Sequence, residues 1–309
     1  MVIDSHVAVN LKGQHLHHST GVHDHVDAAE SHLAMATSST DQVARIMIWS
    51  PPRSVSTAFA RSMSARGDTE VFWEPYLACY YYGPERKVNW AESVPEMLND
   101  NYTYSYVDKL LDADYPDSKV LFVKGMIEGI RGDFDIVNPK YKHSFLVRRP
   151  EKTYKSLDHM SKVVPGKPHD LITAFKNIYH DLEDFYNHVQ TKLSQPSPPI
   201  IDADDLVAHP ETILPKYCEA MGIEFTPKML EWDSVDAREL RWHFADVGDI
   251  FHEATRNTIV LSNAMHGRGF GEAPKLAHYT DSTLSSLVEE YTEHAMPVYE
   301  RFYERRIKP

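Results

Sequence analysis

From Arg45 onward, short apolar segments alternate with longer segments of helical spacing, and this alternation constrains the fold more than any other feature of the sequence. Apolar runs of about four to eight residues are typical of strands in a parallel sheet that is covered on both faces. Strands are expected at 46–49, 70–73, 120–123, 144–147 and 199–202, and helices near 55–66, 92–112, 151–163, 169–193, 210–221 and 281–304. The sequence therefore predicts the α/β class, with a central parallel β-sheet flanked by helices.

The first 42 residues differ in composition from the rest of the chain. They are polar and irregular, with histidines scattered among Ser, Thr, Asp and Gly at His6, His15, His17, His18, His23, His25 and His32. Irregular spacing without Cys partners favours a disordered leader, and a metal-binding segment is the alternative. We predict a disordered His-rich leader over 1–42 and a single α/β domain over 43–309.

The net charge restricts the possible partners. Asp and Glu number 45 against 32 Lys and Arg, which gives a formal charge of −13 and argues against nucleic acid or an anionic membrane. Cys79 and Cys218 have no metal-ligand spacing, and no apolar run reaches the length of about 18 residues that spans a membrane. We expect a cytoplasmic protein that binds neither nucleic acid nor membrane, while the sequence leaves its oligomeric state open.

A phosphate-binding loop is expected where the first strand runs into Ser50-Pro51-Pro52-Arg53-Ser54-Val55-Ser56-Thr57 and a helix follows. A strand, a tight turn and a helix start gather free backbone N–H groups and the positive end of the helix dipole around one point. Arg53 adds a forked charged donor, and the hydroxyls of Ser54, Ser56 and Thr57 complete the cradle. The plainer alternative is a capped helix after a proline turn, with Arg53 in solvent.

The same segment carries a family resemblance. The nucleotidase loop Gly-x-x-x-x-Gly-Lys-[Ser/Thr] is absent, because both glycines and the lysine are missing. The stretch from Ile48 to Thr57 instead resembles the loop with which P-loop sulfotransferases grip the 5′-phosphosulfate of 3′-phosphoadenosine 5′-phosphosulfate. In that resemblance Arg53, Ser56 and Thr57 match binding positions, with Ser54 and Val55 between them. A three-layer α/β sulfotransferase fold is implied, and so is this donor.

A second match lies in His143–Leu157, where Arg148 ends an apolar strand and Pro150 fits the first turn of the next helix. Ser156 follows about two helical turns later, on a face that can look back toward Arg148. In sulfotransferases an Arg at a strand end and a Ser eight residues on bind the 3′-phosphate of the donor, and Arg148 and Ser156 have that spacing. A solvated basic helix face is the alternative. The resemblance extends from about Val43 to Trp232, and beyond it Gly267–Gly271 is a candidate donor loop or an ordinary turn.

The resemblance also implies the catalytic groups. Lys124, at the end of the third strand, corresponds to a lysine that bridges donor and acceptor oxygens; a strand-end lysine reaching water is the alternative. Met126 stands where many sulfotransferases have a catalytic histidine. Glu74 is therefore the preferred base, because it resembles a strand-end glutamate of other branches, although an ion-paired or capping glutamate fits equally. Arg53 serves the leaving phosphate. Reserve bases without positional support are His159, His252 and His266.

Aromatic residues crowd the sequence after Glu74, at Tyr76, Tyr80, Tyr81, Tyr82 and Trp90. They suggest a pocket for a small organic acceptor, with Tyr76, Tyr80 and Trp90 as its binding residues, although plain packing is the commoner role of such side chains. The expected reaction is transfer of a sulfuryl group to a hydroxyl or amine of this acceptor, with no metal required.

Two other functions stay open. An ATP-dependent phosphate-loop kinase or hydrolase would use Asp202 to hold magnesium at a strand end, but it leaves the Arg148 and Ser156 pair unexplained. A sulfotransferase-like scaffold that binds nucleotide or metabolite without transfer is the third reading, because the base is not certain.

Overall fold

The computed structural model describes residues 43–88, 98–163, 171–234, 240, 242–244, 264, 266–271 and 285–309. All of them belong to one unit of dense internal contacts, Asp41–Pro309. The predicted leader over 1–42 lies outside the described residues.

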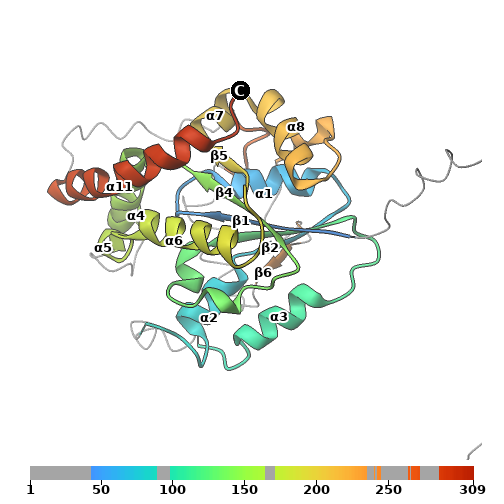
Figure 1. The fold of residues 1–309 in the computed structure, drawn as a ribbon, viewed down its shortest axis with the longest axis horizontal. Helices are drawn as coiled ribbons and strands as arrows, with labels where there is room; N and C mark the ends of the chain where they lie inside the picture. Colours follow the sequence, from blue (N-terminus) through green and yellow to red (C-terminus); the bar gives the residue numbers. More distant parts are fainter. Residues whose placement is uncertain are drawn as a thin grey trace, which may run out of the picture. The chain divides into compact units, whose positions relative to one another are not determined.

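A six-stranded sheet in the order β5-β4-β1-β3-β2-β6 forms the centre of this unit (Figure 1). All five strand pairings are parallel. The strands are β1 (Ala44–Ser50), β2 (Thr69–Trp73), β3 (Val120–Met126), β4 (Lys142–Val147), β5 (Ile200–Asp202) and β6 (Trp242–Phe244). The parallel sheet and its flanking helices confirm the predicted fold class. Since parallel strands end on the same edge, the residues that follow β1, β2, β3 and β4 are brought to one side of the molecule.

Side chains of each strand alternate between two hydrophobic cores, as strand geometry requires. Met47 and Trp49 of β1 pack in one core with the helices α2, α3, α4, α6 and α11. Ile46 and Ile48 pack in the other with α1, α7 and α8. In Figure 1, α1, α7 and α8 lie on one side of the sheet, and α2, α3 and α6 lie on the other. Burial on both faces explains why β1, β3 and β4 are continuous apolar runs.

The helices are α1 (Ser56–Ala65), α2 (Pro75–Tyr82), α3 (Tyr104–Asp112), α4 (Pro150–Val163), α5 (Leu171–Ala174), α6 (Ile178–Thr191), α7 (Ala203–Ala208), α8 (Pro210–Met221) and α11 (Ser286–Arg305). Short 3₁₀ turns are η3 (Ile127–Ile130), η4 (Phe134–Ile136) and η5 (Pro227–Met229). Among the described residues, no helix is both long and apolar enough to cross a membrane.

Several elements differ from the sequence expectation. The helix expected near 92–112 is α3, which begins at Tyr104, and the short helix α7 was not expected. The helix expected over 169–193 is divided into α5 and α6. The tyrosine-rich segment after Glu74 forms α2, with Pro75 in its first turn. The short strand β6 was not expected; it pairs with β2 through the register Phe72 with His243. Three residues are too few for a periodic pattern, so only the pairing partner reveals this strand.

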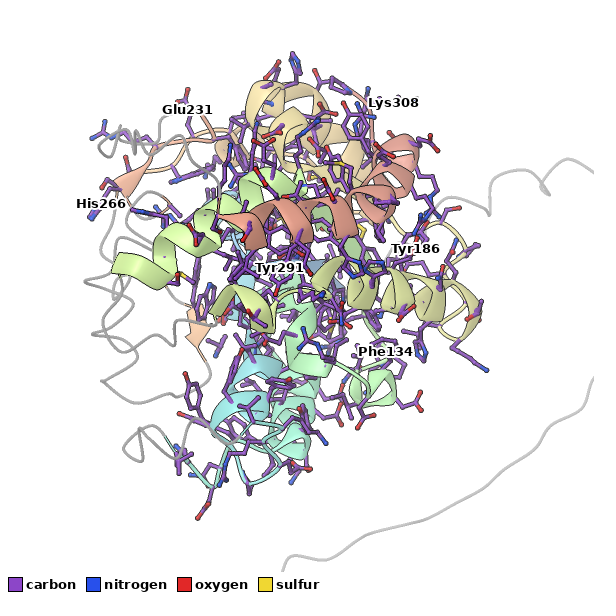
Figure 2. The ribbon with its side chains drawn as sticks, turned by 90° about the vertical axis from the view of Figure 1, so that its left-hand side faces the viewer. Phe134, Tyr186, Glu231, His266, Tyr291 and Lys308 are labelled. Carbon is purple, nitrogen blue, oxygen red and sulfur yellow. The ribbon has the colours of Figure 1, made fainter. Side chains whose placement is uncertain are left out.

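The C-terminal helix α11 closes the core against α4, α5 and α6, and Figure 2 shows its Tyr291 near the middle of that layer. Ser285 caps the helix, since its side chain accepts a hydrogen bond from the Val288 N–H. The Tyr291 ring packs 5.9 Å from the Tyr154 ring of α4. The chain then passes β5, where the Ile307 N–H donates to the Ile200 carbonyl at 2.8 Å.

Candidate active site

The loop between β1 and α1 has the backbone of an anion-binding turn. Arg53 (φ 63°) and Val55 (φ 69°) both adopt the left-handed conformation, which is unusual for residues other than glycine. Val55 is the N-cap of α1, and no side chain caps the helix there. The N–H groups of the first helical turn, from Ser56 onward, therefore point out of the helix end toward the loop. Strained backbone of this kind persists where surrounding contacts hold it, and it is common at functional sites.

Contacts within the loop explain how it keeps this shape. The Ser54 hydroxyl is buried and donates to the Pro51 carbonyl at 2.8 Å, which braces the turn from inside. Ser56 is buried at the helix start, and Thr57 is half-buried beside it. The sequence-predicted residues Ser54, Val55, Ser56 and Thr57 thus lie together around the first turn of α1.

Arg53 and the second predicted anchor meet in space, although 95 and 103 residues separate them in sequence. The Arg53 Nε donates to the Ser156 Oγ at 2.9 Å, and the Arg148 Nη1 donates to the Arg53 carbonyl at 2.8 Å. Arg148 follows β4 directly, and Ser156 lies on α4. We name Arg53, Arg148 and Ser156 the arginine cluster. The sequence-predicted pairing of Arg148 with Ser156 is thus brought against the loop at the carboxyl edge of the sheet.

The electrostatics of the arginine cluster favour an anion. Burial lowers the pKa of Arg53, and the positive charge of Arg148 lowers it further. Two guanidinium groups held close together repel each other, and a bound anion would offset that repulsion because it attracts both groups. Arg148 is itself positioned by the buried Tyr179, whose hydroxyl donates to the Arg148 carbonyl and lies 3.1 Å from the Thr153 hydroxyl. The cluster therefore has the charge and the rigid support of a phosphate site.

A second group of functional side chains lies at the ends of β2 and β3. Lys124 and Glu74 form an ion pair between Nζ and Oε1, with only 3% and 7% of the two side chains exposed. The Glu74 N–H also donates to the Lys124 carbonyl at 2.8 Å. Trp73 pairs with Lys124 across the sheet, and its ring lies 4.9 Å from the Lys124 ammonium. Two of the three residues predicted to be catalytic, Glu74 and Lys124, are thus in direct contact. The pair lies at the same sheet edge as the phosphate loop.

The backbone places Glu74 for this contact. Glu74 has a φ of 50° and is the N-cap residue of α2, but its side chain makes no capping hydrogen bond. The carboxylate turns to Lys124 instead. The carboxylate is thus held at the carboxyl end of β2, where a strand-end glutamate could serve as a general base.

Trp49, which sequence reasoning passed over, lies near the end of β1, between β3 and β4 in the sheet. Its indole Nε1 donates to the His143 Nδ1 at 3.1 Å, and its ring lies 5.8 Å from the Tyr76 ring. A Cβ atom on Gly125 would come within 2.7 Å of the Trp49 ring, so only glycine fits beside it. Trp49 precedes the loop, and Gly125 follows Lys124. No local sequence pattern marks such a residue, because its importance comes from three neighbouring strands.

Of the three residues predicted to bind the acceptor, the structure describes two, and both are buried. Tyr76 is 2% exposed and its hydroxyl accepts a hydrogen bond from the Asn138 N–H at 3.3 Å, so it is part of the core in this structure. Tyr80 is 6% exposed and packs edge-on against the Tyr81 ring. Burial raises the pKa of Tyr80, while the positive charge of Arg131 lowers it. Trp90 lies outside the described residues.

Of the reserve bases, the structure describes His159, on α4, and His266; it also describes Asp202. His252 is outside the described residues. His266 is exposed and lies 3.4 Å from the Ser234 hydroxyl, on the side of Figure 2 where Glu231 also lies. Asp202 caps α7 by accepting hydrogen bonds from the Asp204 and Asp205 N–H groups. Its other oxygen accepts from the Tyr299 hydroxyl at 3.0 Å. Both oxygens of Asp202 therefore have structural partners.

The candidate glycine loop lies close to the phosphate-loop helix. Gly269 forms an antiparallel bridge with Glu231, and the Trp232 N–H donates to the Arg268 carbonyl at 3.1 Å. The buried Arg61 of α1 donates to the Asp233 carbonyl and so ties this segment to α1. Sequence reasoning missed Arg61; the one available signal is its position one helical turn after Thr57.

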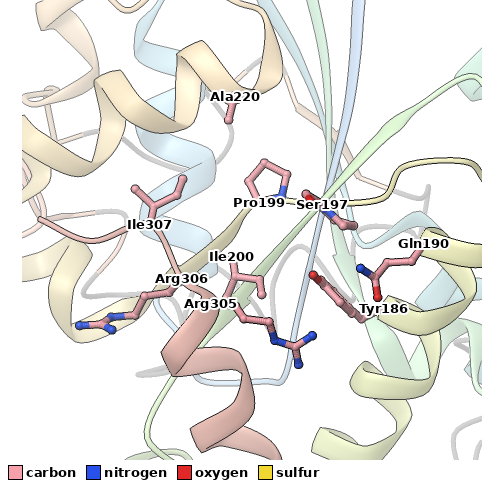
Figure 3. Close-up of a pocket in the computed structure, with 10 residues that line it drawn as sticks. Tyr186, Gln190, Ser197, Pro199, Ile200, Ala220, Arg305, Arg306 and Ile307 are labelled. Atoms are coloured by element: carbon pink, nitrogen blue, oxygen red, sulfur yellow. The ribbon is translucent and has the colours of Figure 1, made fainter.

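A cavity of about 490 Å³ lies away from these groups (Figure 3). It is lined by Pro199 and Ile200 at the start of β5, by the second half of α6 and by Arg305–Ile307 after α11. Since the candidate active site lies beyond the carboxyl ends of the strands, this cavity is not part of it.

The chain is similar to a few known proteins over part of its length. No model of a known protein family matches the chain. The chain is 28% identical over 206 residues to the branched-chain-amino-acid aminotransferase-like protein 2 of Arabidopsis thaliana, an alignment that covers 61% of this chain and 32% of the plant protein. It is 30% identical over 111 residues to the sulfotransferase ppzF of Metarhizium majus (strain ARSEF 297), which covers 31% of this chain and 32% of the fungal protein. The chain thus spans about a third of the length of these curated relatives.

Among solved structures, the sulfotransferase domain from the curacin biosynthetic pathway superposes with a TM-score of 0.50 at 16% identity. The superposition covers 86% of this chain and 99% of that domain. The fold of the chain is therefore that of a sulfotransferase-like α/β domain.

Proposed function

We propose that the protein is a sulfotransferase that moves a sulfuryl group from 3′-phosphoadenosine 5′-phosphosulfate to a hydroxyl or amine of a small organic acceptor. The observation that carries this proposal is the arginine cluster beside the left-handed phosphate loop. A single phosphate needs only one such site. The combination of a helix-end site with a second cationic site fits a nucleotide that carries phosphates at two positions.

The residues divide the work of an in-line transfer. The bond between sulfur and the 5′-phosphate oxygen breaks while a bond between sulfur and the acceptor oxygen or nitrogen forms. The N–H groups at the start of α1 and the hydroxyls of Ser56 and Thr57 offset the negative charge that grows on the leaving phosphate. Glu74 takes the proton that the acceptor loses. Lys124 is paired with Glu74 and so orients its carboxylate, and its ammonium supplies positive charge for the transferred oxygens.

The alternative of an ATP-dependent kinase or hydrolase has less support. Asp202, which would hold magnesium in that reading, uses both carboxylate oxygens to cap α7 and to bind Tyr299. The plant relatives add no second candidate, because the alignment spans only 32% of the aminotransferase-like protein. The similarity to the fungal sulfotransferase supports sulfuryl transfer. We further propose that the acceptor is a small molecule and that the enzyme works in the cytoplasm without a metal.

Donor binding and transfer test this function in two steps. Adenosine 3′,5′-bisphosphate should raise the melting temperature of the purified protein more than AMP does, and more than ATP with magnesium does. The protein should then transfer radiolabel from ³⁵S-labelled donor to a component of a metabolite extract. The Arg53→Ala variant should lose this transfer with an unchanged circular dichroism spectrum, because the side chain lies in the loop and not in the core. Magnesium-dependent stabilisation by ATP alone would support the kinase instead, and binding without transfer would support a non-catalytic scaffold.

A further inference from the structure

The side chain of Arg53 does not lie where its position in the loop leads one to expect. As a residue of the 5′-phosphate loop, it is expected to serve the leaving phosphate at the start of α1. Its Nε instead binds the Ser156 Oγ on α4, the residue predicted to bind the 3′-phosphate. The left-handed backbone at Arg53 accompanies this placement, with a φ of 63°.

Arg148 reinforces this arrangement from the other side. Its Nη1 binds the carbonyl of Arg53, so the guanidinium of Arg148 holds the peptide group of Arg53. The guanidinium of Arg53 in turn holds Ser156. These two bonds link the loop after β1 to the end of β4 and to α4. They bring the guanidinium of Arg53 to Ser156 and the guanidinium of Arg148 to the backbone of Arg53.

We propose that Arg53 is a specificity-determining residue for the 3′-phosphate and shares its recognition with Arg148 and Ser156. This inference rests on the proposed function, since it presupposes a donor with a 3′-phosphate. Within the loop, the 5′-phosphate is then bound by backbone N–H groups and by the hydroxyls of Ser56 and Thr57.

The chemistry of the two phosphates supports this division. A 3′-phosphate monoester carries close to two negative charges near neutral pH, because its second pKa is about 6. Two guanidinium groups match that charge, and each forms forked hydrogen bonds to phosphate oxygens. The cost of holding two half-buried cations close together falls when the dianion binds, which favours binding at this point. A 5′-phosphate in the donor carries one negative charge, which a helix end and hydroxyls are suited to bind.

Binding of three nucleotides separates the two assignments. Dissociation constants for adenosine 3′,5′-bisphosphate and for AMP are measured by calorimetry, with 3′-AMP as the complementary probe. The preference is the affinity for the bisphosphate divided by the affinity for AMP. Arg53→Ala should lower this preference about tenfold or more, as the loss of a charge-assisted hydrogen bond implies, and should weaken 3′-AMP by a similar factor. Arg53→Lys should retain part of the preference, because it keeps the charge and loses the fork.

Two control variants calibrate the measurement. Thr57→Ala, at the start of α1, should weaken both nucleotides by the same factor and leave the preference unchanged. Lys155→Ala removes a positive charge next to Ser156 whose ammonium is paired with Glu151 at the surface, so it should change neither value by more than about twofold.

The result that overturns the inference is equal weakening of the bisphosphate and AMP by Arg53→Ala, which would assign the side chain to the shared 5′-phosphate. Failure of the proposed function appears differently. In that case the unmodified protein itself would show no preference for the bisphosphate over AMP.

Discussion

Two groups of charged residues lie at the same edge of the sheet, and their electrostatics are opposite. The arginine cluster after β1 and β4 brings two positive charges together, supported by hydrogen bonds to the loop backbone and to Ser156. The pair of Glu74 and Lys124 after β2 and β3 brings together one charge of each sign, nearly excluded from water. A cluster of like charges is completed by a ligand, whereas an ion pair is complete without one. Changes in the cluster should therefore alter ligand affinity, and changes in the pair should alter rate and stability.

The largest expected effect is on the transfer rate. Glu74→Gln keeps the size of the side chain and its ability to accept a hydrogen bond from Lys124 but removes its basicity. The catalytic rate should fall about 10²- to 10⁴-fold while the affinity for adenosine 3′,5′-bisphosphate stays nearly the same. Single-turnover rates measured alongside calorimetry would test this. A near-normal rate would contradict the role of Glu74 as base, and a matching loss of bisphosphate affinity would mean that the two groups are not separate.

The next effect is on stability. Lys124→Met leaves the Glu74 carboxylate buried without its cation and should lower the free energy of unfolding by about 3–5 kcal/mol. The control is Lys140→Met, which breaks the ion pair with Asp112 at a site where 60% of the lysine side chain is exposed. This control substitution should lower the free energy of unfolding by about 0–1 kcal/mol.

Urea denaturation of the two lysine variants at one pH gives the comparison directly. Similar losses for Lys124→Met and Lys140→Met would mean that the buried pair contributes no more than a surface pair. The double variant Glu74→Gln with Lys124→Met should regain part of the stability, because no unpaired charge is left inside.

A smaller effect is expected on ligand affinity in the arginine cluster. Arg148→Ala should weaken adenosine 3′,5′-bisphosphate by about 1.5–3 kcal/mol and hardly change AMP, as loss of a charge-assisted hydrogen bond implies. The melting temperature without ligand should change little by comparison with Lys124→Met. Equal losses of affinity for the two nucleotides would show that Arg148 does not distinguish the 3′-phosphate.

The smallest effect concerns His143, which lies on β4 beneath the cluster and accepts the Trp49 indole hydrogen bond. Burial lowers the pKa of His143 from 6.5 to about 3, with a further contribution from the charge of His188. The unfolded chain binds a proton near pH 6.5 and the folded protein does not, so stability falls as the pH falls below that value. Between pH 7.5 and 5.5 this residue should account for a loss of about 1.3 kcal/mol.

His143→Gln offers the control, since it still accepts a hydrogen bond from Trp49 but does not titrate. Between pH 7.5 and 5.5, the free energy of unfolding of this variant should fall by about 1.3 kcal/mol less than that of the unmodified protein. Urea denaturation at both pH values measures this difference. An identical pH dependence in the two proteins would mean that His143 is protonated in the folded state.

Much of the fold could be predicted from local sequence. The apolar runs of β1, β3 and β4 and the transition from Ser50 to the helix at Ser56 are local features, because burial on both faces of a strand and the geometry of a helix start are expressed within a few residues. The spacing of Arg148 and Ser156 is also local, since one strand end and two helical turns contain it. The α/β class and the candidate loop therefore followed without any tertiary information.

Tertiary contacts alone decided how these parts combine. The direction of the Arg53 side chain depends on Ser156, which is 103 residues away. The direction of the Glu74 carboxylate depends on Lys124, which is 50 residues away. Likewise, Tyr76 lies in the core because the Asn138 N–H and the Trp49 ring meet it there, although its sequence neighbourhood suggested a ligand pocket. Side-chain direction and pairing of charge are set by which strands become neighbours, and an order such as β5-β4-β1-β3-β2-β6 is not encoded in any local pattern.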